Sequence, residues 1–341
     1  MENKYYAKIV GLGSSLGNKR ITNLDLAGRL GLSAEEIEVK TGIRYRYHCD
    51  SEKENLYVLM ASAAEQALKS ANLPKEKING IFSACNPTGD YLLPNTSSIV
   101  ANLMELPEFY NGGISTGCSG GLTALDAACN KLPWKNTQNY LVLGGDQTSR
   151  IVKPGSSDEI LFSDGASGII VSNDPFIKGY YSIDKVDNKC FPEKSKVLSL
   201  GRKDSFLDHD GKAVYQFATR TMKNILEMLE VNKFPKDVYF IPHQANLRII
   251  NRLTRDLDHN LVYKKGIVNI GNTSSASAFI GLEEVNRKNL SPHKKIILGT
   301  FGEGLTVALA KITSSGKPLP EKLDEVSLKE KYMEIYKRKW N

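Results

Sequence analysis

The sequence predicts a layered α/β fold built from two copies of one structural unit. A glycine-flanked turn occurs twice, at residues 117–121 and 271–275, and apolar residues at helical spacing follow each copy. A short apolar run that ends in glycine comes next in both places, at residues 140–144 and 295–299, as is typical of buried strands. This repeated order of turn, helix and strand indicates a duplicated fold and not two unrelated domains.

Segments before these turns extend the repeat. The helical pattern of residues 57–71 matches that of residues 215–229, and the strand-like residues 81–83 match residues 238–240. Each copy therefore begins with a helix and a strand before its glycine-flanked turn.

Three regions follow from the limits of the repeat. The first copy ends near Asn173 and the second near Ile312. We therefore expect an N-terminal half over residues 1–173, with a candidate nucleophilic cysteine, and a C-terminal half over residues 174–312, with a histidine and an asparagine. Residues 313–341 turn polar and charged, and we expect a tail of helical character outside the core.

The bulk composition is that of a folded, enzyme-sized protein. With 341 residues, of which 41% are hydrophobic and 24% charged, the chain can bury a large core. No segment is long and apolar enough to span a membrane and the N-terminus resembles no signal peptide, so we expect a cytoplasmic protein without a membrane partner. The five cysteines are odd in number and include no C-x-x-C pair, which disfavours a disulfide framework and a zinc site.

The net charge of +7 leaves two interpretations open. Lysine and arginine are dispersed and do not alternate with aromatic residues, so we expect no nucleic-acid partner. The charge can attract a local acidic partner, or it can simply keep the protein in solution.

Cys118 is the first candidate for chemistry. It lies at a glycine-flanked junction before a predicted helix, so its thiol would stand at a helix N-terminus. The helix dipole and the backbone N–H groups there lower a thiol pKa, which favours the nucleophilic thiolate. A buried structural cysteine is the alternative interpretation when the Gly-Cys-Ser-Gly segment is taken alone.

The second copy offers two partners for Cys118. His243 follows the predicted strand 238–241, at the strand end where α/β proteins place their ligands. Asn272 lies in a loop of the same copy. A cysteine, a histidine and a side-chain amide from separate loops are a recurring catalytic combination, whereas the sequence has no Walker loop and no H-E-x-x-H helix for phosphate or metal chemistry.

With these residues in place, the sequence resembles the β-ketoacyl-acyl-carrier-protein synthase III family of the thiolase superfamily. The resemblance covers about residues 5–312. Its most specific segments occur in the family's order and are Ile21-Thr22-Asn23-x-Asp25-Leu26, Thr41-Gly42-Ile43-Arg44, the Cys118 segment, His243-Gln244-Ala245-Asn246-Leu247-Arg248, Gly271-Asn272-Thr273-Ser274 and Phe301-Gly302-x-Gly304. The resemblance implies a thiolase-like fold of duplicated five-layer αβαβα architecture, in agreement with the repeat.

The resemblance also implies an acyltransferase with two half-reactions. Cys118 would attack an acyl thioester, while the backbone N–H groups of Cys118 and Glu303 stabilise the oxyanion. A malonyl thioester would then lose CO₂, and His243 with Asn272 would hydrogen-bond the enolate oxygen. No permanently bound cofactor is implied: the substrates are acyl thioesters of acyl carrier protein phosphopantetheine or of coenzyme A. The expected partners are acyl carrier protein and a second copy of the chain.

Further residues are assigned to the substrate path by the resemblance. The acyl and pantetheine tunnel would be lined by Leu93 (from the second subunit), Phe162, His209, Tyr215, Asn246 and Phe301. Arg248 and Lys40 would lie at the carrier-protein entrance. The polar residues 188–211 have no regular pattern and predict an irregular excursion near that entrance.

Several positions depart from the family's usual pattern. Glu36 and Lys40 stand where a Trp and an Arg usually hold the adenine of coenzyme A, which favours a carrier-protein-bound donor or another acyl donor over coenzyme A. Glu303 replaces a small residue. Leu93 replaces a residue that is often Phe, which leaves room for a longer or branched acyl group.

Three functions stay open from the sequence. The leading hypothesis is a decarboxylating Claisen condensation in fatty-acid, specialised-lipid or polyketide synthesis. The second is transfer of the acyl group from Cys118 to an oxygen or nitrogen nucleophile without decarboxylation, with His243 as general base. The third is a non-catalytic partner subunit of a heteromeric ketosynthase, against which the presence of Cys118, His243 and Asn272 together argues.

Overall fold

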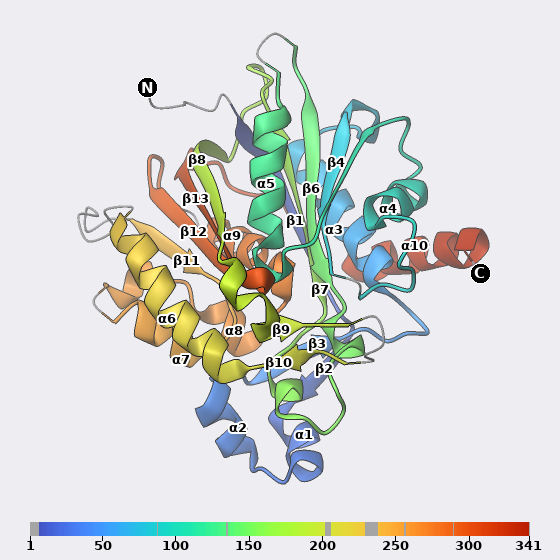
Figure 1. Ribbon diagram of the computed structural model, residues 1–341. Helices are drawn as coiled ribbons and strands as arrows, with labels where there is room; N and C mark the ends of the chain where they lie inside the picture. Colours follow the sequence, from blue (N-terminus) through green and yellow to red (C-terminus); the bar gives the residue numbers. More distant parts are fainter. Residues whose placement is uncertain are drawn as a thin grey trace.

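A large central sheet organises the protein (Figure 1). The computed structural model describes residues 7–86, 88–133, 136–201, 206–228, 238–255, 257–288 and 290–340, with the backbone alone for residues 221–228 and 259. In this described part, nine strands form the sheet in the order β11-β12-β13-β8-β1-β7-β6-β4-β5. Their bounds are β1 (Lys8–Leu16), β4 (Gly80–Ala84), β5 (Tyr110–Ile114), β6 (Asn139–Asp146), β7 (Gly165–Ser172), β8 (Tyr181–Cys190), β11 (Tyr239–Pro242), β12 (Lys295–Gly302) and β13 (Thr306–Ser314).

The two halves of the sheet repeat one pattern of strand pairing. In the N-terminal half β4 and β6 are parallel, and β7 pairs antiparallel with both β6 and β1. In the C-terminal half β11 and β12 are parallel, and β13 pairs antiparallel with both β12 and β8. The halves meet where β1 and β8 share two residue pairs. The duplication predicted from the sequence is thus confirmed.

Helices complete five layers around these two half-sheets. Helix α3 (Leu56–Ala71) covers the outer face of the N-terminal half, against β1, β6 and β7. Helices α5 (Gly120–Lys131) and α9 (Ser277–Asn286) lie between the halves, since each contacts strands of both. Helix α6 (Gly211–Met228) and α7 (Leu247–Leu253) pack on the outer face of the C-terminal half through one apolar cluster. The layer order is therefore αβαβα.

Smaller elements frame this core. The other helices are α1 (Asn23–Leu30), α2 (Ala34–Thr41), α4 (Thr96–Met104), α8 (Lys265–Asn269) and α10 (Glu325–Trp340). Two short hairpins are formed by β2 (Lys19–Thr22) with β3 (Tyr45–His48), and by β9 (Leu198–Ser199) with β10 (Asp208–His209). The second hairpin corrects the expectation for residues 188–211: β8 extends to Cys190 and the hairpin follows, because backbone pairing there depends on neighbours that local composition does not reveal.

Predicted helices and strands lie close to the observed ones. The observed α3 begins one residue before the predicted helix 57–71, and α6 begins four residues before the predicted 215–229, whose last residue lies outside the described part. The apolar runs 140–144 and 295–299 lie within β6 and β12, the second of them at the start of its strand.

The C-terminal tail packs on the N-terminal half. Helix α10 contacts α3 and α4, and it buries Tyr332 and Tyr336. The buried Lys329 ammonium lies 3.1 Å from the Glu54 carboxylate and 3.0 Å from that of Glu325, so the tail is joined to the core by ion pairs as well as by apolar contacts. The limits at 173 and 312 stay predictions. Within the described residues, no helix has both the length and the hydropathy needed to cross a membrane.

Candidate active site

Cys118 lies where the two halves of the protein meet. It belongs to the 3-10 turn Gly117–Ser119, which follows β5 and leads directly into α5. Its side chain is buried, with 8% of its surface exposed, and the thiol donates a hydrogen bond to Ser274 Oγ at 3.4 Å. The thiol of the first copy and a hydroxyl of the second copy are thereby in direct contact.

The environment of Cys118 disfavours the thiolate in the free protein. Burial raises the pKa of the thiol to about 12; the Ser274 hydroxyl lowers it, and the carboxylates of Asp146 and Glu303 raise it further. The position at a helix start agrees with the sequence analysis, but the expected low thiol pKa is wrong. Desolvation outweighs the helix N-terminus because the sulfur has little contact with solvent.

This pKa makes a testable prediction for alkylation of the free protein. The rate at which iodoacetamide labels Cys118 should rise about tenfold per pH unit between about pH 7 and 10, because the thiolate fraction keeps growing below a pKa near 12. Peptide mapping by mass spectrometry separates Cys118 from the exposed Cys190. A labelling rate that levels off below about pH 8 would contradict the prediction.

His243 is a neutral, fixed imidazole. It follows β11, and its backbone N–H donates to Gly299 O at 2.7 Å. Complete burial lowers the pKa of the ring to about 3. Nδ1 lies 2.8 Å from Ser277 Oγ, and the Phe301 ring packs edge-on at 4.9 Å between centroids. When the Ser277 hydroxyl donates to Nδ1, the ring carries its proton on Nε2, from which it can donate to an oxygen in the cavity.

Asn272 presents its amide NH₂ group to the same cavity. Its Oδ1 accepts a hydrogen bond from the Ser274 backbone N–H at 2.9 Å, which fixes the side-chain oxygen away from substrate. Among the described residues, Nδ2 has no hydrogen-bond partner. The backbone around Asn272 is held to Leu161 and Ser163 by two hydrogen bonds of 3.0 and 2.8 Å. His243 and Asn272 can therefore supply two neutral donors to one site.

The loops of Cys118 and Glu303 approach each other closely through glycines. A Cβ atom at Gly302 would lie 2.7 Å from the Cys118 backbone N, and one at Gly117, where φ is +56°, would lie 2.7 Å from the Glu303 N. Cys118 and Glu303 each lie at the start of a 3-10 turn, where backbone N–H groups have no partner within the turn. The Glu303 carboxyl accepts from Ser115 Oγ at 3.3 Å, and burial raises its pKa.

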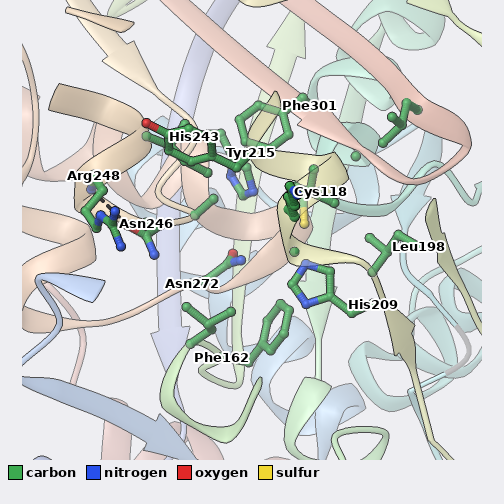
Figure 2. Close-up of a pocket in the computed structure, with 18 residues that line it drawn as sticks. Cys118, Phe162, Leu198, His209, Tyr215, His243, Asn246, Arg248, Asn272 and Phe301 are labelled. Carbon is green, nitrogen blue, oxygen red and sulfur yellow. Dashed lines mark hydrogen bonds between the residues drawn. The ribbon is translucent and has the colours of Figure 1, made fainter. Parts of the chain in front are cut away.

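One cavity brings most of the predicted residues together. Figure 2 shows Cys118, His243 and Asn272 around it, and its volume is about 340 Å³. The predicted tunnel and entrance residues that line it are Phe162, His209, Tyr215, Asn246, Phe301 and Arg248. Its remaining lining is largely apolar, with Leu161, Leu198, Val214, Ile249 and Leu305 among the contributors. A reactive thiol at the wall of an apolar cavity suits an acyl chain.

Two of the predicted tunnel and entrance residues lie outside the cavity wall. Lys40 is at its mouth, where its backbone oxygen accepts from Asn246 Nδ2 at 3.3 Å. Leu93 has 84% of its side chain exposed and borders a second cavity of about 440 Å³. A residue that acts on the neighbouring subunit has to be exposed in the single chain, so this position neither supports nor opposes the prediction.

Sequence reasoning missed several supporting groups. Ser277 holds His243, and Asp146, at the end of β6, accepts hydrogen bonds from the Ser275 hydroxyl at 2.7 Å and from the Asn86 backbone N–H at 2.8 Å. Ser274 and Ser275 follow shortly after Asn272 in the sequence, but the sequence does not show that they contact Cys118 and Asp146. Glu36 has a structural role within its own helix: its carboxylate accepts a hydrogen bond from the Ser33 backbone N–H at 2.7 Å and caps the N-terminus of α2.

A duplicated five-layer core with a cysteine between its halves defines a thiolase-fold acyltransferase. Comparison with known proteins identifies the family. Family models for 3-oxoacyl-[acyl-carrier-protein] synthase III match residues 113–184, and for its C-terminal part residues 226–313. The chain belongs to this family. It is 33% identical over 311 residues to β-ketoacyl-[acyl-carrier-protein] synthase III of Aquifex aeolicus, covering 88% of this chain and 96% of that protein.

Other relatives agree. The enzyme of the same name from Caldanaerobacter subterraneus subsp. tengcongensis is 34% identical over 327 residues, covering 89% of this chain and 97% of that protein. The crystal structure of the Aquifex aeolicus enzyme superposes with a TM-score of 0.82 at 28% identity, over 90% of this chain and 99% of that one. The priming β-ketosynthase of the R1128 polyketide pathway shares the fold, with a TM-score of 0.83 at 23% identity over 94% and 99% of the two chains.

Proposed function

We propose that the protein condenses an acyl group on Cys118 with a malonyl thioester by decarboxylation. The observation that carries this proposal is the pair of neutral donors, His243 Nε2 and Asn272 Nδ2, at the cavity that holds the thiol. An enolate oxygen is a developing anion, and preorganised neutral donors stabilise such a charge best in a site without water. The proposal includes the relatives' use of acyl carrier protein, which their names state.

The first half-reaction loads the enzyme. The Cys118 sulfur attacks the thioester carbonyl, the oxyanion meets the backbone N–H groups of Cys118 and Glu303, and the carrier thiol leaves with the proton that Cys118 gives up. Burial raises the pKa of the Cys118 thiol to about 12, so in this proposal the thiol loses its proton as it attacks the bound thioester.

The second half-reaction makes the carbon nucleophile. A malonyl carboxylate leaves as CO₂, and the resulting enolate is held by His243 and Asn272 while its carbon attacks the acyl group. The C–S bond then breaks and the Cys118 sulfur takes up a proton. A His243 pKa of about 3 favours this donor role over the rival role of general base, whose pKa is best placed near neutrality.

The donor is proposed to arrive on acyl carrier protein. Arg248 and Lys212 line the cavity and are both exposed, so they form a basic mouth that suits an acidic carrier and its phosphate. Glu36 adds a negative charge on α2, which disfavours the nucleotide of coenzyme A.

Intact-protein mass spectrometry tests the first step. The protein is incubated with acetyl, hexanoyl and decanoyl thioesters, each carried by acyl carrier protein or by coenzyme A. The mass gained by the protein identifies the donor. CO₂ release from malonyl acyl carrier protein then tests the second step. Acyl loading without any CO₂ release across these donors would favour the rival acyl transfer to oxygen or nitrogen.

A homodimer is proposed as the working form. Strand β5 is an edge strand, and exposed apolar side chains gather near it: Tyr110 is 45% exposed, Leu92 74% and Leu93 84%. Light scattering should therefore give the mass of two chains, and Leu93→Asp should weaken the association at micromolar concentration. Leu24→Asp, which changes a 77% exposed leucine on α1, is the matched control. A fully active wild-type monomer would contradict this prediction.

A further inference from the structure

A second histidine, His209, lies at the cavity of Cys118 (Figure 2). It belongs to β10, and its Nδ1 is 2.8 Å from Asp158 Oδ1 in the 3-10 turn Ser157–Ile160. The His209 and Asp158 side chains are 10% and 21% exposed. Two residues 51 positions apart thus form an ion-pair geometry at the wall of the active-site cavity.

The surroundings fix the orientation of the His209 ring. The β9–β10 hairpin pairs His209 with Leu198, and the Phe162 ring packs edge-on with 6.4 Å between centroids. Because the Asp158 carboxylate accepts from Nδ1, the neutral ring leaves Nε2 as a hydrogen-bond acceptor. Nε2 has no hydrogen-bond partner among the residues that the structure describes, and it lies on the side of Gly211, another cavity residue.

The decarboxylating condensation does not need the Asp158–His209 pair to form its carbon nucleophile. Loss of CO₂ itself generates the attacking carbon, so no proton has to be removed from it. A hydroxyl nucleophile is different, since its O–H proton has to leave as the oxygen attacks. His243 is a poor acceptor for that proton because burial lowers its pKa to about 3.

We propose that the Asp158–His209 pair acts as general base for a second reaction, the transfer of the acyl group from Cys118 to a hydroxyl-bearing acceptor. His209 Nε2 takes the O–H proton while the acceptor oxygen bonds to the acyl carbon. The thioester C–S bond breaks, an ester leaves, and the proton passes to the Cys118 sulfur. Asp158 is a positioning residue that keeps the Nδ1 proton in place. This inference rests on the acyl-Cys118 intermediate of the proposed function.

The cavity favours an uncharged alcohol as the acceptor. The lining is largely apolar and, in the described part of the chain, includes Lys212 and Arg248 but no Asp or Glu. A protonated amine would therefore enter beside two cations without a counterion, whereas a neutral hydroxyl needs none. An aliphatic primary alcohol fits both the apolar wall and the free acceptor on His209.

The test uses the full chain loaded with an acyl group. Protein acylated by hexanoyl or decanoyl acyl carrier protein is freed of excess donor and mixed with 1-butanol or with buffer. Mass spectrometry then follows both the acyl-enzyme and the butyl ester. We expect ester from the wild type, and roughly 100-fold slower ester formation in His209→Gln, which keeps a polar side chain of similar size but cannot serve as a base.

The variants separate a chemical role from a binding role. Asp158→Asn should lower kcat for ester formation with little change in KM for 1-butanol, because it disturbs the ring and not the alcohol site. In both variants ester formation should fall at least about tenfold more than acyl loading or CO₂ release does. Asp208→Asn, an exposed neighbour on β10 that does not line the cavity, is the control and should leave all three rates unchanged.

Three other results would overturn the proposal that Asp158 and His209 act as a general base. Absence of butyl ester from a wild-type acyl-enzyme that still condenses with malonyl carrier protein would overturn this inference alone. Parallel loss of ester formation, loading and CO₂ release in His209→Gln and Asp158→Asn would assign the pair to thioester binding instead. Absence of any acyl-enzyme in the wild type would overturn this inference and the proposed function together.

Discussion

Replacement of Cys118 by alanine is expected to abolish acyl loading, with a loss of at least about 10⁴-fold in overall rate. Among the described residues, Cys118 is the only thiol at the cavity of His243 and Asn272. No other side chain there can form a thioester, so both half-reactions stop when the sulfur is removed. Intact-protein mass after incubation with an acyl thioester measures the loss, and peptide mapping shows which residue carries the acyl group.

Two other cysteines serve as controls for this experiment. Cys129 is buried on α5, eleven residues after Cys118, and burial raises its pKa well above the usual value. Cys190 is exposed and lies next to the Glu303 turn, where its sulfur contacts Gly304 O. Cys190→Ala should load as the wild type does. An acyl group found on Cys85 or Cys129 of the wild type would refute the assignment of Cys118 as nucleophile.

Replacement of Asn272 by alanine is expected to separate the two half-reactions. The amide NH₂ of Asn272 faces the cavity, and its proposed partner, the enolate oxygen, exists only after CO₂ leaves. Acyl loading should therefore persist, while CO₂ release from malonyl acyl carrier protein falls by roughly 100-fold or more, as for loss of one oxyanion donor. Asn130→Ala, on the exposed end of α5, is the matched control.

His243→Ala should behave in the same way if the histidine is a donor to the enolate. Under the rival function, His243 would accept the proton of an oxygen or nitrogen nucleophile and Asn272 would only orient it. Asn272→Ala would then be mild, and the wild type would release no CO₂ from malonyl thioesters. Measuring loading and CO₂ release in the wild type and both variants decides between these functions.

Much of the secondary structure could be predicted from the sequence because it depends on the local spacing of apolar residues and glycines. Apolar runs that end in glycine predicted β6 and β12, and the helical spacing after residues 117–121 and 271–275 predicted α5 and α9. The hairpin of β9 and β10 was missed. Its strands are two residues long, and their pairing gives no periodicity that a sequence window can detect.

The residues of the cavity could be predicted only in part from the sequence. Motifs identified Cys118, His243 and Asn272 as candidates, and the structure places all three at one cavity. Their partners Ser274 and Ser277 come from the turn and helix that follow Asn272, and neither contact is implied by spacing along the chain.

By itself, the sequence determined that this protein has a duplicated α/β core with a candidate thiol nucleophile at a helix start, because strand and helix periodicity and glycine positions are local properties of the chain. Only the tertiary structure decided the protonation of that thiol and the pairing of His209 with Asp158. A pKa depends on how much water burial removes, and here burial outweighs the helix start that the sequence had suggested. The pair depends on a hairpin and a turn meeting at one cavity wall, a contact made by packing between segments distant along the chain.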